Sequence, residues 1–185
     1  MSEKKNDSAS SRGFGVRSAR KICVVALFTA LNVALSSFSI TVPGGQLYLN
    51  DVAICFAALF LDPLSAFIVG GAGAFLGDLL FYPAAMFVSL VSHGLEAIAI
   101  SLIAHGYRGE TPKLWRAIVG VLAGAILMIA GYTIGRAYTY GTWQSSILKL
   151  PFEILQAGTG AVAGTILFYA TPLRKIAPRV NALSP

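Results

Sequence analysis

The stretch that decides the fold is residues 47–104, which reads LYLNDVAICFAALFLDPLSAFIVGGAGAFLGDLLFYPAAMFVSLVSHGLEAIAISLIA. Its apolar runs are broken at Asp62-Pro63, and three ionisable residues, Asp78, His93 and Glu96, stand inside them. An Asp or Lys at the centre of a membrane helix costs about 2.5–3.5 kcal/mol on insertion scales, so such residues usually mark a functional site. This stretch therefore predicts apolar helices arranged around a polar pocket.

The composition of the whole chain is that of a membrane protein. Only 12% of the residues are charged, 56% are hydrophobic and the mean hydropathy is +0.71, whereas about a quarter of a soluble domain is charged. We therefore predict an all-α integral membrane protein with one membrane domain at 22–171. A basic cytoplasmic tail at 1–21 precedes it, and a cytoplasmic tail at 172–185 follows it.

Six apolar stretches are close to the roughly 20 residues that cross a bilayer, or somewhat shorter. The breaks between them contain turn residues, such as Pro43-Gly44-Gly45, Asp62-Pro63 and Pro172. The second and third stretches are short, which favours a hairpin of tilted or partly submerged helices. The six predicted transmembrane helices are 22–40, 47–61, 64–82, 84–105, 114–137 and 147–171.

The basic residues predict the orientation of these helices. Twelve of the fourteen lysines and arginines fall on one side of a six-span topology, and an excess of basic residues marks the cytoplasmic side. Both termini are therefore predicted to be cytoplasmic. The twelve are Lys4, Lys5, Arg12, Arg17, Arg20, Lys21, Arg108, Lys113, Arg116, Arg174, Lys175 and Arg179.

In this topology the polar residues of the spans converge on one level, in the outer half of the membrane or near its middle. Residues spaced by three or four share one face of a helix, as Ser89, His93 and Glu96 do. We therefore predict a pocket that opens to the outside and is lined mainly by the last three helices. The predicted substrate-binding residues are Asp78, Ser89, His93, Glu96, Tyr132, Arg136, Glu153 and Gln156.

Several of these residues also have a structural interpretation. Asp51, Arg136 and Lys149 fit side chains near the membrane surface that reach water. His93 and Glu96 fit a buried pair that only supports packing. Asp62, which precedes a proline, is typical of a turn or helix cap.

Some classes of function are not supported by any motif. The chain has no phosphate-binding loop, no dinucleotide fingerprint, no H-E-x-x-H motif and no paired cysteine ligands. We predict no metal, no cofactor and no catalytic residue in this chain, so ATP for uphill transport would be used by partner subunits. The basic N-terminal tail is explained by topology and anionic lipid, without nucleic acid.

Small residues spaced by four allow membrane helices to approach closely. Four glycine pairs have this spacing and predict internal packing, and the alanines of the first span predict a smooth ridge that another membrane helix could contact. The glycine pairs are Gly73/Gly77, Gly120/Gly124, Gly131/Gly135 and Gly160/Gly164, and the ridge is Ala26, Ala30 and Ala34.

The chain resembles the S components of energy-coupling factor (ECF) vitamin transporters, in the branch of riboflavin, hydroxymethylpyrimidine and pyridoxine subunits. The resemblance covers most of residues 22–171. It is carried by Leu49-Asn50-Asp51, residues 57–66 (AALFLDPLSA), residues 69–73 with Gly77-Asp78-Leu79, and His93-Gly94-Leu95-Glu96.

This resemblance implies a subunit of the bacterial cytoplasmic membrane that binds a vitamin or precursor from outside with high affinity. It implies docking of the Ala26–Ala34 ridge on a transmembrane coupling protein, EcfT, which works with two ATPases, EcfA and EcfA′. It also implies that the loop at about 41–50 closes over the ligand and that the subunit topples in the membrane to deliver it.

The pocket residues narrow the choice of substrate. They offer hydrogen-bond partners of both kinds and no cluster of arginines, which a phosphate or polycarboxylate would require. We therefore expect a small heteroaromatic such as hydroxymethylpyrimidine or a pyridoxine-like compound, then riboflavin, then pantothenate or cobalamin. A stand-alone proton-coupled carrier and an intramembrane enzyme remain as alternative classes.

Overall fold

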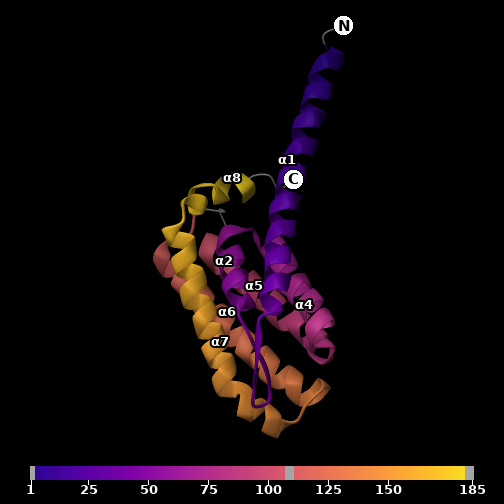
Figure 1. Cartoon of the computed structure of the whole chain (residues 1–185). Helices are drawn as coiled ribbons and strands as arrows, with labels where there is room; N and C mark the ends of the chain where they lie inside the picture. Colours follow the sequence, from indigo (N-terminus) through magenta and orange to yellow (C-terminus); the bar gives the residue numbers. More distant parts are fainter. Residues whose placement is uncertain (1–2, 107–110, 182–185) are drawn as a thin grey trace.

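The computed structural model describes residues 3–106 and 111–181, with side chains from residue 19 onward. It is a bundle of long helices with one β-hairpin and a short C-terminal helix (Figure 1). Five of the basic residues that predict the orientation lie outside the described side chains, namely Lys4, Lys5, Arg12, Arg17 and Arg108. The first half of the chain forms α1 Glu3–Ser36, β1 Ser39–Val42, β2 Gly45–Tyr48, α2 Asn50–Phe60, α3 Pro63–Phe67, the π-helical η1 Ile68–Ala72 and α4 Gly73–Phe81. The second half forms the 3₁₀ turn η2 Pro83–Ala85, α5 Met86–His105, α6 Leu114–Thr139, α7 Trp143–Ala170, the 3₁₀ turn η4 Pro172–Lys175 and α8 Ala177–Asn181.

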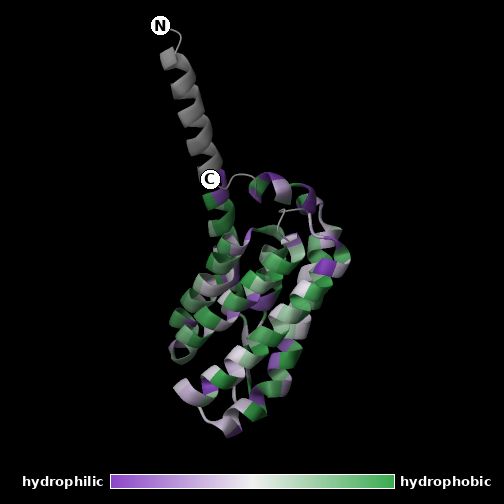
Figure 2. Cartoon of the chain, turned by 180° about the vertical axis from the view of Figure 1, so that it is seen from behind, coloured by the Kyte–Doolittle hydropathy of each residue, from purple (hydrophilic) through white to green (hydrophobic). Residues whose placement is uncertain are grey.

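The all-α membrane fold is confirmed. Within the described part of the chain, five helical stretches are long and apolar enough to cross a membrane, and apolar residues cover these helices (Figure 2). The sixth apolar helix, α2, has 11 residues and is therefore about 16 Å long, about half of the hydrocarbon thickness. The five long stretches are Ala19–Ser36, Pro63–Phe81, Pro83–His105, Leu114–Thr139 and Trp143–Ala170.

The predicted ends of the first two spans are wrong, because a β-hairpin lies between them. The antiparallel strands β1 and β2 pair Ser39 with Tyr48 and Val42 with Gly45. Pro43 and Gly44 form the turn, where Gly44 has a φ of 86°, a backbone conformation that favours glycine. The hairpin runs from the ends of α1 and α2 along α7 (Figure 1), so 37–40 and 47–49 leave the helices.

The span at 63–81 is one rod built from α3, η1 and α4. At the π-helical turn the amide Nδ2 of Asn32 in α1 donates to the carbonyl oxygen of Val69 at 2.6 Å. Further along, Gly73 and Gly77 leave room for Asn32 and for Ser36. These contacts bind α1 to the rod at two successive turns.

The glycine pairs pack inside the bundle, as their spacing predicted. Gly120, Gly124, Gly131 and Gly135 of α6 face residues of α5, and Gly160 of α7 faces Asp51 of α2. Because Asp51 begins α2 inside the bundle, the close approach at Gly160 fixes the position of a carboxylate as well as that of a helix.

Gly160→Ala should therefore destabilise the protein and weaken substrate binding. A Cβ at residue 160 would lie 2.5 Å from Cβ of Asp51 and 2.9 Å from its carbonyl carbon, so α2 and α7 must move apart. The matched control is Gly158→Ala, two residues away, where no atom lies within 4 Å of the added Cβ. There, alanine should leave the melting temperature unchanged or raise it, because it favours a helix by about 1 kcal/mol. Equal melting temperatures for the two variants would contradict this packing.

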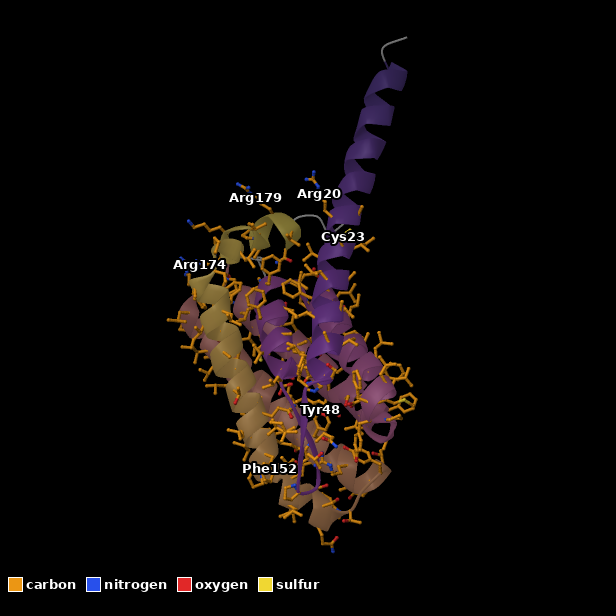
Figure 3. All side chains as sticks on the ribbon, in the orientation of Figure 1. Arg20, Cys23, Tyr48, Phe152, Arg174 and Arg179 are labelled. Carbon is orange, nitrogen blue, oxygen red and sulfur yellow. The ribbon has the colours of Figure 1, made fainter. Side chains whose placement is uncertain are left out.

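The end of the bundle where α8 contacts α1 is held together around Asp62. Its backbone N–H donates to Asn181 Oδ1 of α8 at 3.0 Å, and its carboxylate lies 2.7 Å from Nζ of Lys21. Asp62 also accepts a hydrogen bond from the N–H of Ser65, which confirms it as the cap of α3. Burial alone would raise the pKa of Asp62, but hydrogen bonds from Lys21 and Ser65 lower it below its usual value. Basic side chains gather at this end, as Arg20, Arg174 and Arg179 show (Figure 3).

Candidate functional site

The eight predicted site residues are all buried within the bundle. Each is at most 5% exposed, and together they come from α4, α5, α6 and α7. The structure brings seven of them together in three adjoining polar groups, which also contain Asp51 and Lys149, while the eighth, Gln156, accepts a hydrogen bond from the backbone N–H of Tyr48 in the hairpin. We call these three groups the inner group, the middle group and the outer group.

The inner group is Asp51, His93 and Glu96. The Nδ1 atom of His93 lies 2.8 Å from Oε2 of Glu96 and 3.3 Å from Oδ1 of Asp51. The thiol of Cys55 donates to the other oxygen of Glu96 at 3.7 Å. None of these three ionisable side chains is more than 1% exposed. Two carboxyl groups therefore face one imidazole in a part of the bundle that is closed to solvent.

The inner group also contains residue types that bind metals. Its three ligand atoms lie within 4.8 Å of one another. However, Nδ1 is already bonded to Glu96, and Nε2 of His93 has no hydrogen-bond partner, whereas the second nitrogen of a metal-bound histidine almost always has one. This geometry favours a hydrogen-bonded cluster.

The middle group is Asp78, Ser89 and Tyr132. The hydroxyl of Ser89 donates to Oδ2 of Asp78 and is hydrogen-bonded to the phenol oxygen of Tyr132. The ring of Tyr132 packs edge-on against His93, with centroids 5.2 Å apart. Asp78 therefore holds Tyr132 through Ser89, and Tyr132 contacts the inner group.

The outer group is Arg136, Lys149 and Glu153. Oε1 of Glu153 lies 2.8 Å from Nη2 of Arg136 and 3.8 Å from Nζ of Lys149, and Nζ of Lys149 also lies 5.6 Å from the centroid of the Tyr132 ring. Thr133 donates to the second oxygen of Glu153 at 3.4 Å. Two cations thus share one carboxylate next to Tyr132.

The hairpin covers these groups from the outer ends of α6 and α7. The backbone N–H of Tyr48 donates to Oε1 of Gln156 at 3.0 Å, and Gly44 and Gly45 pack on Lys149. Tyr48 lies where the hairpin meets the interior (Figure 3). The hairpin contains most of the loop at about 41–50 that the resemblance implies closes over the ligand, and it lies over these groups, whose side chains are at most 5% exposed.

Asp51 and Lys149 were assigned as possible surface residues, and that interpretation is wrong for both. They are 1% and 4% exposed, and Arg136 is 2% exposed. Asp51 is deep because α2 is short and begins below the hairpin. The Lys149, Glu153, Gln156 spacing on one helix face was the signal that could have placed Lys149 in the site.

An apolar core closes the opposite side of the inner group. Ile100, one turn after Glu96 on α5, packs with Leu59 of α2 and Phe168 of α7, and all three side chains are fully buried. The polar groups therefore lie between a covering hairpin and an apolar core, a position suited to enclosing a small molecule.

A groove of about 860 Å³ runs along α1, separate from the polar groups. Ala26, Ala30 and Ala34 are exposed in it, so the predicted ridge faces away from the bundle. The groove is lined by Lys21, Ile22, Val25, Ala26, Thr29, Ala30, Val33 and Ala34 of α1 and by Leu64, Ser65, Ile68 and Leu76 of the neighbouring rod.

Comparisons with known proteins agree with this architecture. Residues 16–174 match the family described as "ECF-type riboflavin transporter, S component". The chain is 33% identical over 154 residues to the "Thiamine precursor transporter HmpT" of Lactococcus lactis subsp. cremoris (strain MG1363), covering 80% of this chain and 85% of the relative. A solved structure described as "Structure and mechanism of the S component of a bacterial ECF transporter" shares the fold, with a TM-score of 0.67 at 17% identity, covering 83% of this chain and 95% of that one.

The family match spans nearly all of the membrane helices. The sequence identity to the relative, 33% over 80% of this chain, is high enough to show a common family. The chain therefore belongs to the S-component family of ECF transporters, whose members are multi-pass subunits of the cytoplasmic membrane that bind the transported substrate and are not enzymes.

Proposed function

We propose that this chain binds hydroxymethylpyrimidine or a pyridoxine-like compound at the outer side of the membrane, as the substrate-binding subunit of an ECF importer. The observation that carries this proposal is the enclosed polar site around Tyr132 in a chain that is one-third identical to a thiamine precursor transporter. Thiamine contains an aminopyrimidine ring, which is the size and kind of ring that an aromatic side chain with flanking polar groups can hold.

Riboflavin is the second candidate, because the matching family is described by that vitamin. Both candidates are planar heteroaromatics with hydroxyl groups, and they differ mainly in size. Neither the matching family nor the relative is described by pantothenate or cobalamin.

The partners in this proposal are EcfT and the ATPases EcfA and EcfA′, and the orientation has both termini in the cytoplasm. Support for the orientation comes from Arg20, Arg174 and Arg179, which lie at the end of the bundle where α8 contacts α1 (Figure 3). Support for the partners comes from the exposed alanines of α1, since small residues favour close helix packing in lipid.

Purified full-length protein should retain its substrate when it is extracted from cells. Mass spectrometry of the released small molecules should identify a pyrimidine or pyridine compound, and isothermal titration with the same compound should give saturable binding. Release of riboflavin alone would replace the first candidate by the second. Release of neither class, with no binding of either, would contradict the proposal.

The lone chain should bind substrate but should not drive ATP-dependent uptake in liposomes, since its sequence contains no phosphate-binding loop. Adding the coupling protein and both ATPases should start uptake. A variant ATPase pair without its catalytic residues is the control. Uphill uptake by the lone chain would contradict the subunit assignment.

A further inference from the structure

The inner and outer groups differ in which hydrogen-bonding atoms lack a partner. Among the described side chains, the inner group contains buried acceptors without hydrogen bonds of good geometry, namely both carboxylate oxygens of Asp51 and Nε2 of His93. With Nδ1–H of His93 directed to Glu96, Nε2 of the neutral ring is an acceptor. The inner group therefore lacks hydrogen-bond donors.

The outer group has the opposite deficit. Nε and Nη1 of Arg136 are buried and without hydrogen-bond partners of good geometry, and Nη2 lies 2.8 Å from Oε1 of Glu153 in an ion pair. Lys149 must share the same Glu153 oxygen at 3.8 Å. In the outer group the cationic donors of Arg136 and Lys149 therefore outnumber the acceptors of the Glu153 carboxylate that they share, and a buried polar group left unpaired costs about 1–3 kcal/mol, more when it is charged.

Tyr132 contacts members of both groups. Its ring packs edge-on against His93, Nζ of Lys149 lies 5.6 Å from its centroid, and Arg136 follows it by one helical turn. The phenol oxygen is engaged with Ser89, which leaves the ring as a fixed apolar surface next to the inner and outer groups.

The geometry points to a two-ended recognition of the substrate, an inference that rests on the proposed function. A planar nitrogen heterocycle lies against Tyr132 with an N–H donor edge, from an amino group or a protonated ring nitrogen, at Asp51 and His93. A substituent that accepts hydrogen bonds, such as a hydroxyl, lies at Arg136 and Lys149 beneath the hairpin. Asp51 and Arg136 are then the residues that determine specificity, at opposite ends of the ring.

A cycle of ligand and protein variants tests this placement. The probes are 4-amino-5-hydroxymethyl-2-methylpyrimidine, the analogue without the amino group and the analogue with methyl in place of hydroxymethyl. Their dissociation constants are measured by titration calorimetry on the full-length protein, on Asp51→Asn and on Arg136→Lys, which keeps the charge beside Glu153 but loses the free guanidinium donors. Thr165→Val, in the half of α7 away from the hairpin, is the control.

Removing the amino group should weaken binding to the unmodified protein by about 10- to 100-fold, the range for a charged hydrogen bond, but should have little further effect in Asp51→Asn. Removing the hydroxyl should weaken binding about 10-fold and should have little further effect in Arg136→Lys. Each variant should leave the response to the other probe unchanged, and Thr165→Val should leave both unchanged.

The placement would be overturned if the losses of affinity from each analogue and its matching variant were additive, or if loss of the amino group were coupled to Arg136. Either result would leave the proposed function intact. If Asp51→Asn does not give a folded protein, His93→Gln replaces it, because His93 supplies the other free acceptor. If no pyrimidine binds, the cycle is run with pyridoxine, with its 5-deoxy analogue, which lacks a hydroxyl group, and with the analogue in which carbon replaces the ring nitrogen. Absence of binding by both compound classes would overturn the proposed function and this placement with it.

Discussion

Ala30→Trp should abolish ATP-driven uptake by the reconstituted complex while changing the substrate affinity of the isolated subunit by no more than about twofold. Ala30 is exposed in the groove along α1, so an indole there would hold a partner helix away, and close approach is what small residues provide in lipid. The polar groups around Tyr132 do not include any residue of α1, which is why binding should persist. Uptake in liposomes and calorimetry on the same protein preparation measure the two effects.

The matched control is Ala130→Trp on α6, which also places an indole at an exposed alanine of a membrane-spanning helix. Helix α6 packs on α5 and α7, whereas α1 packs on α2 and on the rod formed by α3, η1 and α4. Uptake should therefore be normal in Ala130→Trp. If Ala30→Trp loses binding and uptake together, Ala30 supports the fold and the groove is not the docking surface.

Glu153→Leu should lower the free energy of unfolding by about 3–5 kcal/mol, the cost of removing one partner of a buried ion pair. Glu153 is 1% exposed and is the shared partner of Arg136 and Lys149, so its loss leaves two cations facing each other in the interior. Unfolding of the purified protein by titration with denaturing detergent measures the effect.

The double variant Arg136→Met with Glu153→Leu separates stability from recognition. Apolar residues of similar size often replace a buried ion pair without loss of stability, so part of the lost free energy should return, while the buried Lys149 stays without its carboxylate. Substrate affinity should stay low, because the guanidinium donors are gone. A double variant that is stable and binds normally would show that the outer group only supports the fold.

The long helices could be predicted from the sequence because their signal is local. Apolar runs between turn residues gave the α6 start at 114 and the α5 end at 105 as the structure has them. The cap at Asp62 was equally local, because an acidic residue before proline has few other uses.

The hairpin and the depth of Asp51 depend on information that a single apolar run does not contain. Ile40 and Val42 are as apolar as the residues at the end of a membrane helix. Only the pairing of residues 40–42 with residues 45–47 shows that they form a strand. Once the hairpin is known, Asp51 must lie below it and Lys149 beneath its turn. The site residues on α5, α6 and α7 were predicted because each of these helices carries a polar stripe, and Asp78 because it is an ionisable residue inside an apolar run. Asp51, at the start of an apolar helix, also fits a position near the membrane surface.

The π-helical turn η1 has a consequence for the direction in which residues of one helix point. In a regular α-helix, residues seven apart return to nearly the same face. Gly70 nevertheless packs on His93 and Ala97 of α5, while Gly77 packs on Ser36 of α1. The wider turn changes the helical phase between Gly70 and Gly77. The rod therefore packs a glycine against α5 at one position and a glycine against α1 at the other. Asp78, immediately after Gly77, has the same helical phase, and its place beside Ser89 is thus set by the wider turn six to ten positions earlier in the chain.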